Sequence, residues 1–219
     1  MLETLPIFPL PDTVLFPRTL IRLHVFEPRY LAMMEAVMAG DQHMGLAHLK
    51  PGYEKDYFGK PPVYKVCTAA RVMLADQEKN GRWNILLEGA YRARIVEELA
   101  SDPFRVVRVR PLVEQFPTDK HGETMRLMEG AARRAEALAE HFENGQRALI
   151  NLVNQHQHPS IVADVISSVI VADPYTRQSL LEEVDPHRRL RLLLIHLDEV
   201  IGQLKDQGVQ VNLPMTEAE

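Results

Sequence analysis

Proline is concentrated in the first half of this chain of 219 residues, where nine of the 15 prolines lie at or before Pro103. Because proline lacks a backbone N–H and breaks helices, this half is expected to consist of strands and turns. The segment from Leu5 to Pro11 has a proline at nearly every second position. Such spacing prevents a helix and favours an extended strand at the edge of a sheet.

The hydrophobic pattern of the first half predicts six strands and one inserted helix. Pro28 suits the first turn of a helix, apolar residues follow at helical spacing, and Gly40 is expected to end the helix with a positive φ. Asn80-Gly81 favours a tight hairpin turn in which both residues have a positive φ. The predicted strands are residues 5–11, 20–26, 63–74, 82–87, 91–96 and 104–113. Strands so closely spaced indicate an antiparallel sheet curled into a barrel over residues 1–115.

The second half has a helical pattern almost to its end. Segments 123–142, 147–156 and one beginning at Pro159 are amphipathic. Thr176 is a candidate N-cap, and Asp185-Pro186 pairs an N-cap residue with a proline at the first helical position. The last helix has an apolar seam of Leu190, Leu193, Leu197, Val200 and Leu204. These patterns predict an α-helical bundle over residues 116–208, a flexible tail over 209–219, and an α+β fold class.

Composition and charge are those of an ordinary globular protein, with 46% hydrophobic and 25% charged residues and a net charge of −5. Residues 1–110 carry 15 Lys+Arg and 13 Asp+Glu, and residues 111–219 carry 10 and 17. Neither half has the excess of cations expected of a nucleic-acid-binding protein. There is no secretory signal pattern, the apolar runs are too short to cross a bilayer, and Cys67 is the single cysteine. We therefore expect a cytoplasmic protein without disulfides.

The motifs that identify common enzyme classes are missing. The Gly59-Lys60 dipeptide has a glutamate where a phosphate-binding loop needs its first glycine and a proline where it needs a hydroxyl. The sequence also lacks the dinucleotide-binding glycine pattern, the helical zinc-protease motif and the nucleophile elbow. These absences predict a protein that is not an enzyme and that uses no cofactor or metal.

Weaker groupings have simpler structural interpretations. His156-x-His158 lacks further ligands for a metal, and Cys67 in a predicted strand is interpreted as a small buried hydrophobe. Glu27 and Arg29 are expected to form a salt bridge or cap where a strand enters the helix. Three methionines lie close together in this helix. Met34 and Met38 are expected in the core and Met33, one position off their stripe, at the surface.

Several segments resemble the Lon substrate-binding domain family, and most closely its stand-alone bacterial members. They are Leu5–Leu10, Val14–Pro17, Leu23–Tyr30, Val66–Val72, Asn80–Arg82 and Leu87–Ile95, followed by weaker similarity through Leu180–Glu182 and Arg189-Leu190. The resemblance covers roughly residues 4–205. It implies a PUA-like pseudo-barrel followed by a helical bundle, a role in recognising other proteins, and no catalytic residue. Cys67 stands where the family usually has glycine.

The leading hypothesis is a non-enzymatic module that binds unfolded or peptide-like protein segments in an apolar cleft between barrel and bundle. Tyr30 and Met33 are expected to form the wall of this cleft, with Phe26 as a buried support. One alternative is RNA binding, as in other PUA-like barrels, through a strand face bearing Arg71, Arg82, Arg92 and Arg94. Another is an adaptor that docks one defined protein partner through the acidic helical half.

Overall fold

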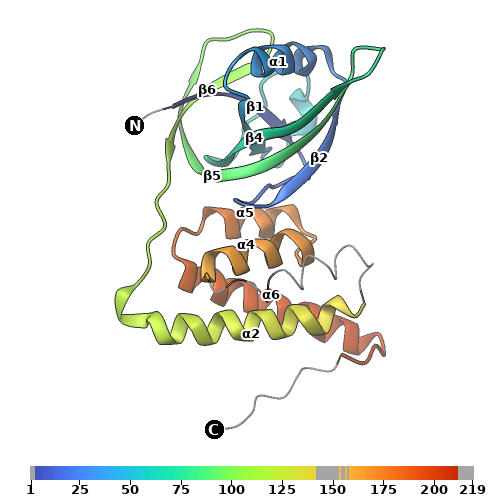
Figure 1. Cartoon of the computed structure of the whole chain (residues 1–219). Helices are drawn as coiled ribbons and strands as arrows, with labels where there is room; N and C mark the ends of the chain where they lie inside the picture. Colours follow the sequence, from blue (N-terminus) through green and yellow to red (C-terminus); the bar gives the residue numbers. More distant parts are fainter. Residues whose placement is uncertain (1–2, 142–152, 154–155, 157, 212–219) are drawn as a thin grey trace. The chain divides into compact units, whose positions relative to one another are not determined.

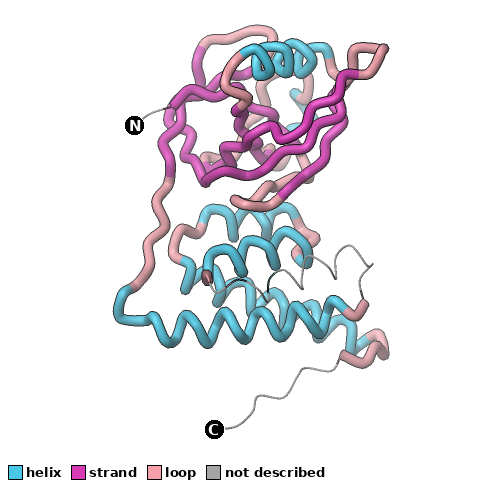
Figure 2. The backbone as a smooth tube through the Cα atoms, viewed as in Figure 1, coloured by secondary structure: helices cyan, strands magenta, loops and turns pink. Residues whose placement is uncertain are grey.

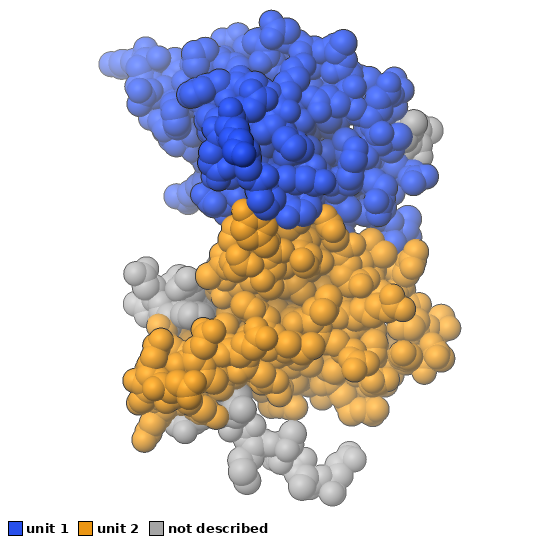
Figure 3. Space-filling view, turned by 180° about the vertical axis from the view of Figure 1, so that it is seen from behind, with its two compact units in different colours: residues 1–113 blue, residues 114–219 orange. Residues whose placement is uncertain are grey.

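The chain divides into two compact units, residues Met1–Val113 and Glu114–Glu219 (Figure 3). The computed structural model describes residues 3–141, 153, 156 and 158–211. The predicted helical segment 147–156 and the predicted tail therefore lie almost wholly outside the described residues.

Unit 1 is a six-stranded sheet in the order β2-β5-β4-β3-β1-β6, which closes on itself because β5 also pairs with β6 (Figure 1). The strands are β1 (Glu3–Leu10), β2 (Leu20–Val25), β3 (His43–His48), β4 (Val66–Gln77), β5 (Trp83–Leu99) and β6 (Arg105–Pro111). The first half of β5 pairs with β2 and its second half with β6, while β4 pairs with residues 83–94 of β5. The predicted barrel is confirmed, with β2 added outside the closed ring.

One helix, α1 (Pro28–Ala39), contributes an apolar stripe to the core of the barrel. Its buried residues are Tyr30, Met33, Met34 and Val37, which recur at the spacing of one helical face. The predicted surface position of Met33 is wrong: its side chain is fully buried. The helix does end at Gly40, but that residue has a φ of −101°, so the expected positive φ is also wrong.

Two errors in the predicted strands offset each other, so that the number of strands is six as predicted. The strand β3 was not predicted, because its glycine and alanine weaken the strand signal. Gly45 lies there with space for no side chain, since a Cβ atom would come within 2.9 Å of Ile7 Cγ2. Segments 82–87 and 91–96, predicted as separate strands, are both part of β5. Here the Glu88-Gly89-Ala90 sequence forms a bulge instead of a turn.

The first strand and the β4–β5 turn also differ from expectation. β1 is internal, with residues 3–7 paired to β6 and residues 7–10 paired in parallel to β3. Each half of β1 thus has one described neighbour, which suits a strand containing proline. The turn contains a Gly81 with a φ of 85°, whereas Asn80 is not among the residues with positive φ. Its bonds are Gly81 N to Glu78 O and Glu78 N to Arg82 O, so the loop is longer than the two residues expected.

Unit 2 is helical, comprising α2 (His121–Ala139), α4 (Pro159–Ile170), α5 (Pro174–Glu182) and α6 (Pro186–Asp206) in the residues described (Figure 2). The helix α2 packs against α4 and α6. Asp185 caps α6 as predicted, accepting hydrogen bonds from the backbone N–H groups of His187 and Arg188. The cap of α5 is Asp173, not Thr176, which instead donates to it. The α+β fold class is confirmed, and no described helix is long and apolar enough to cross a membrane.

Candidate functional site

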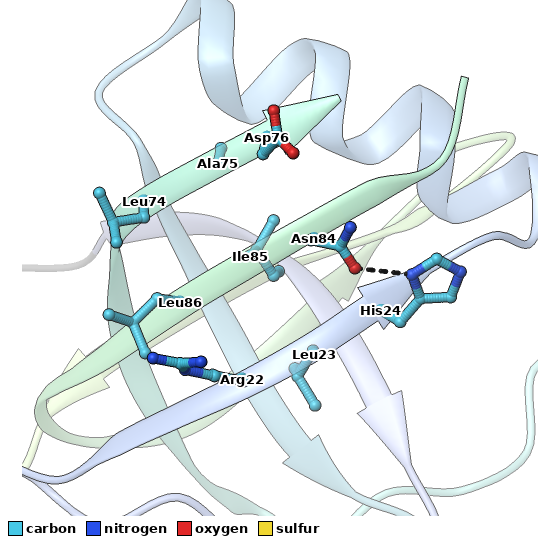
Figure 4. Close-up of a pocket in the computed structure, with 9 residues that line it drawn as sticks. All are labelled: Arg22, Leu23, His24, Leu74, Ala75, Asp76, Asn84, Ile85 and Leu86. Atoms are coloured by element: carbon cyan, nitrogen blue, oxygen red, sulfur yellow. Dashed lines mark hydrogen bonds between the residues drawn. The ribbon is translucent and has the colours of Figure 1, made fainter. Parts of the chain in front are cut away.

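A pocket of about 640 Å³ lies on the outer face of the strands β2, β5 and β4 (Figure 4). We call it the outer groove, and it is lined by Arg22, Leu23, His24, Leu74, Ala75, Asp76, Asn84, Ile85 and Leu86. The strand register arranges its outward side chains in two cross-strand rows. One row is Leu74, Leu86 and Arg22, and the other is Asp76, Asn84 and His24. One end of the groove, which we call its apolar end, therefore has two leucines beside the cation Arg22, and the other end is polar throughout.

A bulge in β4 creates the apolar end of the outer groove. Val72 pairs with Leu87 and Leu74 pairs with Leu86, so Met73 is an extra residue between them. In a regular strand Leu74 would face inward like Val72, because alternate side chains share a face. The extra residue reverses this parity, and the side chain of Leu74 is 66% exposed. The sequence carries no signal for this bulge, and sequence analysis did not identify Leu74 or Leu86.

The polar end of the outer groove is held by hydrogen bonds from the β4–β5 turn. Asn84 Nδ2 donates to Glu78 Oε1 over 2.8 Å, and Asn84 Oδ1 lies 2.9 Å from His24 Nδ1. Hydrogen bonds from Asn80 and Asn84 hold the pKa of Glu78 below its ordinary value. The carboxylate therefore stays ionised, and because the Asn84 amide faces it, Asn84 presents its oxygen to His24.

Phe26 extends the polar end of the outer groove with an exposed aromatic ring. It is 56% exposed and stacks on His24 with ring centroids 6.0 Å apart. The prediction that Phe26 is buried is wrong, because the alternation of β2 points Val25 inward and leaves Phe26 outward. Tyr30 is also not a surface wall, since it is only 5% exposed and lies with Met33, Ile85 and Leu87 in the core beneath these strands. That Phe26, Tyr30 and Met33 take part in binding peptide stays a prediction.

Glu27 and Arg29 form the predicted salt bridge, with Arg29 Nη2 and Glu27 Oε2 3.0 Å apart. Arg29 also donates to the backbone carbonyls of Tyr57, Phe58 and Gly59. Glu27 in turn accepts a hydrogen bond of 3.1 Å from the Tyr57 hydroxyl. Glu27 makes no side-chain cap bond to the helix. Through these hydrogen bonds, the pair instead holds the loop around residue 58 against the start of α1.

The four arginines proposed for RNA do not form one exposed face. Arg92 is buried, at 3% exposure, and Arg71 is paired with Glu88 over 3.2 Å. Arg82 and Arg94 are exposed. The arrangement lacks the open cationic row that phosphate groups require.

The remaining candidates have structural positions. Cys67 is fully buried in the barrel, and burial raises the pKa of its thiol to about 12, as expected of a core residue. His158 contacts Phe116 edge-on, with ring centroids 5.4 Å apart. Within the described part of the chain, no three His, Cys, Asp or Glu residues are grouped so that they could hold a metal ion.

Comparison with known proteins places this architecture in a family. The family model for the ATP-dependent protease La (LON) substrate-binding domain matches residues 4–199. Similar curated proteins are a Lon protease of Trichlorobacter lovleyi, 31% identical over 192 residues, and one of Desulfosudis oleivorans, 26% identical over 203 residues. These matches cover 86% and 93% of this chain but 23% and 25% of the relatives. The chain thus spans about a quarter of their length.

Solved structures agree with this match. The N-terminal domain of a Mycobacterium avium complex Lon protease has a TM-score of 0.72 at 20% identity and covers 90% of this chain and 99% of its own. A Lon N-terminal domain protein from Xanthomonas campestris has a TM-score of 0.61 at 25% identity, covering 88% and 98%. The family match over nearly the whole chain, with the same fold in these structures, shows that the chain belongs to the Lon substrate-binding domain family.

Proposed function

We propose that the outer groove binds apolar segments of unfolded or peptide-like polypeptides without catalysing a reaction. The observation that carries this proposal is the exposed Leu74 beside the partly buried Leu86, in a pocket large enough for side chains of a second chain. Exposed apolar surface of this kind is costly in water unless a partner covers it. Phe26 would contact the bound chain beside His24, and Tyr30 and Met33 would support the strands from beneath.

The strand β2 adds a second source of binding energy. This strand stands at one end of the sheet order, and its neighbour in the described registers is β5. An extended segment could therefore add to its free edge through backbone hydrogen bonds, which do not depend on sequence. Burying one leucine contributes roughly 1.5–3 kcal/mol, and association costs a large part of the total. We expect dissociation constants on the order of 10 µM to 1 mM and broad specificity.

The test is binding of a fluorescent, acetylated and amidated peptide rich in leucine and phenylalanine, measured by anisotropy. We expect Leu74→Glu to weaken binding about tenfold or more, because it places a charge at the apolar end of the outer groove. Leu192→Glu is the matched control, since Leu192 is an exposed leucine on α6 in the other unit. Thermal melting of each variant checks that the fold is intact.

Two outcomes would contradict the proposal. One is equal affinity of the peptide for the wild type and for the Leu74→Glu variant. The other is salt-dependent binding of structured RNA with no binding of the peptide, which would favour the RNA alternative.

A further inference from the structure

A second pocket in unit 1, of about 260 Å³, lies at the start of α1. We call it the α1 pocket. Its lining residues come from α1, from the loop that Arg29 holds, and from the segment leading into β6. They are Arg29, Tyr30, Phe58, Gly59, Lys60, Asp102, Pro103, Phe104 and Arg105.

Two buried side chains bring hydrogen-bond donors to the α1 pocket. The side chain of Tyr30 lines the pocket and is only 5% exposed, and its hydroxyl can donate one hydrogen bond. Burial raises its pKa to about 12, so the hydroxyl keeps its proton at neutral pH. Arg105 is 8% exposed and uses three N–H groups, two on Glu98 and one on the carbonyl of Pro61. A guanidinium has five N–H groups, so two remain for a ligand.

The charges and apolar groups around the α1 pocket indicate the kind of ligand. Lys60 is exposed at the pocket and donates to the backbone carbonyl of Ser101 over 3.2 Å, which leaves two of its three N–H groups. Asp102 is the opposing carboxylate among the lining residues. Phe58 is 86% exposed, and Pro103 and Phe104 add apolar surface. Donors thus lie beside apolar groups, which suits an anion attached to an apolar body.

We propose that the α1 pocket binds the terminal carboxylate of a polypeptide that ends in an apolar residue. Tyr30, Lys60 and Arg105 would donate to the carboxylate, and Phe58 would contact the last side chain. The volume suits about one residue, which favours a chain end over a longer anionic segment. This inference rests on the proposed function, and it adds a preference for free C-termini.

The chain itself connects the two sites. His24 lines the outer groove, Phe26 is exposed beside it, and Arg29 lines the α1 pocket five residues after His24. A short stretch of chain, from the end of β2 to the start of α1, therefore contributes to both sites.

The experiment compares three acetylated peptides that share one apolar sequence. The first has a free C-terminal carboxylate, the second a C-terminal amide, and the third an amide together with an internal glutamate. With the wild type we expect the free acid to bind about tenfold more tightly than either amide, and this advantage to shrink as salt is added. Tyr30→Phe and Lys60→Gln should each reduce the advantage severalfold, whereas Asp102→Asn should increase it.

Lys205→Gln, which removes the same charge from α6 in the other unit, should leave the advantage unchanged. Thermal melting checks the fold of each variant, and the Tyr30→Phe ring keeps its packing against Phe8. Equal binding of free acid and amide overturns this inference and leaves the proposed function standing. Equal binding of the free acid and the internal glutamate peptide overturns the assignment to chain ends. Binding of none of the three peptides contradicts the proposed function itself.

Discussion

One buried charge, that of Arg189, connects several segments of the helical unit. Arg189 on α6 is fully buried, and all five of its N–H groups make hydrogen bonds. Its partners are the carboxylates of Glu114 and Asp164 and the backbone carbonyl of Glu183. Ser160 donates a further bond of 2.6 Å to Glu114. One guanidinium therefore connects the start of the unit, α4, the segment before α6, and α6 itself.

Replacing this cation should be strongly destabilising. Arg189→Met leaves two carboxylates without their buried partner, and we expect the free energy of unfolding to fall by about 3–5 kcal/mol in urea titrations. Arg191→Met, at an exposed position on the same helix, should change it by less than about 0.5 kcal/mol. A loss below about 1 kcal/mol for Arg189→Met would show that the cluster is not a structural centre.

At the scale of elements, β5 depends on a close approach between two backbones. Gly89 N donates to Thr19 O over 3.0 Å, and Arg18 N donates to Gly89 O over 2.7 Å. A Cβ atom on Gly89 would lie 2.1 Å from the carbonyl oxygen of Phe16. Since that oxygen belongs to backbone, it cannot move aside as a flexible side chain can. The bulge at this point lets one long strand pair with both β2 and β6.

Gly89→Ala should therefore destabilise the protein, by about 1–3 kcal/mol, because the segment from Phe16 to Thr19 must shift. The matched control is Gly202→Ala in α6, where an added Cβ would meet nothing within 4 Å. There the higher helix propensity of alanine should stabilise the protein by roughly 0.5–1 kcal/mol. Urea unfolding measures the change in the free energy of unfolding for both variants. A Gly89→Ala variant as stable as the wild type would refute the close approach.

For the molecule as a whole, the folded state stabilises the ionised form of two carboxyl groups, Glu98 and Asp173, relative to the unfolded chain. A side-chain hydrogen bond from Arg105 lowers the pKa of Glu98 below its ordinary value of 4.5. Hydrogen bonds from Thr176 likewise lower the pKa of Asp173 below 3.8. These two groups lie in different units, so the same linkage acts in both.

The sign of the pH dependence follows from these directions. A carboxyl group with a depressed folded-state pKa contributes stability above its unfolded pKa and loses it as the pH falls through the folded value. We expect the urea midpoint to change little from about pH 7 to pH 5 and to fall at lower pH. Glu98→Gln should make that acid loss shallower. A midpoint that rises on acidification would contradict the assignment.

Features set by neighbouring residues along the chain could be predicted. Pro28 and Asp185-Pro186 start helices where expected, because a proline at the first helical position and a capping carboxylate act within a few residues. The proline-rich first half forms strands for the same local reason. The ion pair of Glu27 and Arg29 was also predicted, since the two residues flank one proline.

The site itself was decided by tertiary structure. Leu74 faces solvent because β4 gains an extra residue opposite β5, and Met33 is buried because the face of α1 is chosen by the barrel that it covers. Gly89 continues a strand because the Phe16 backbone approaches it from far along the chain. The sequence alone determined where α1 and α6 begin and which class of fold the chain builds, since those preferences are local. Only the folded chain decided which apolar side chains face outward, because strand parity and helix rotation depend on pairing between distant residues.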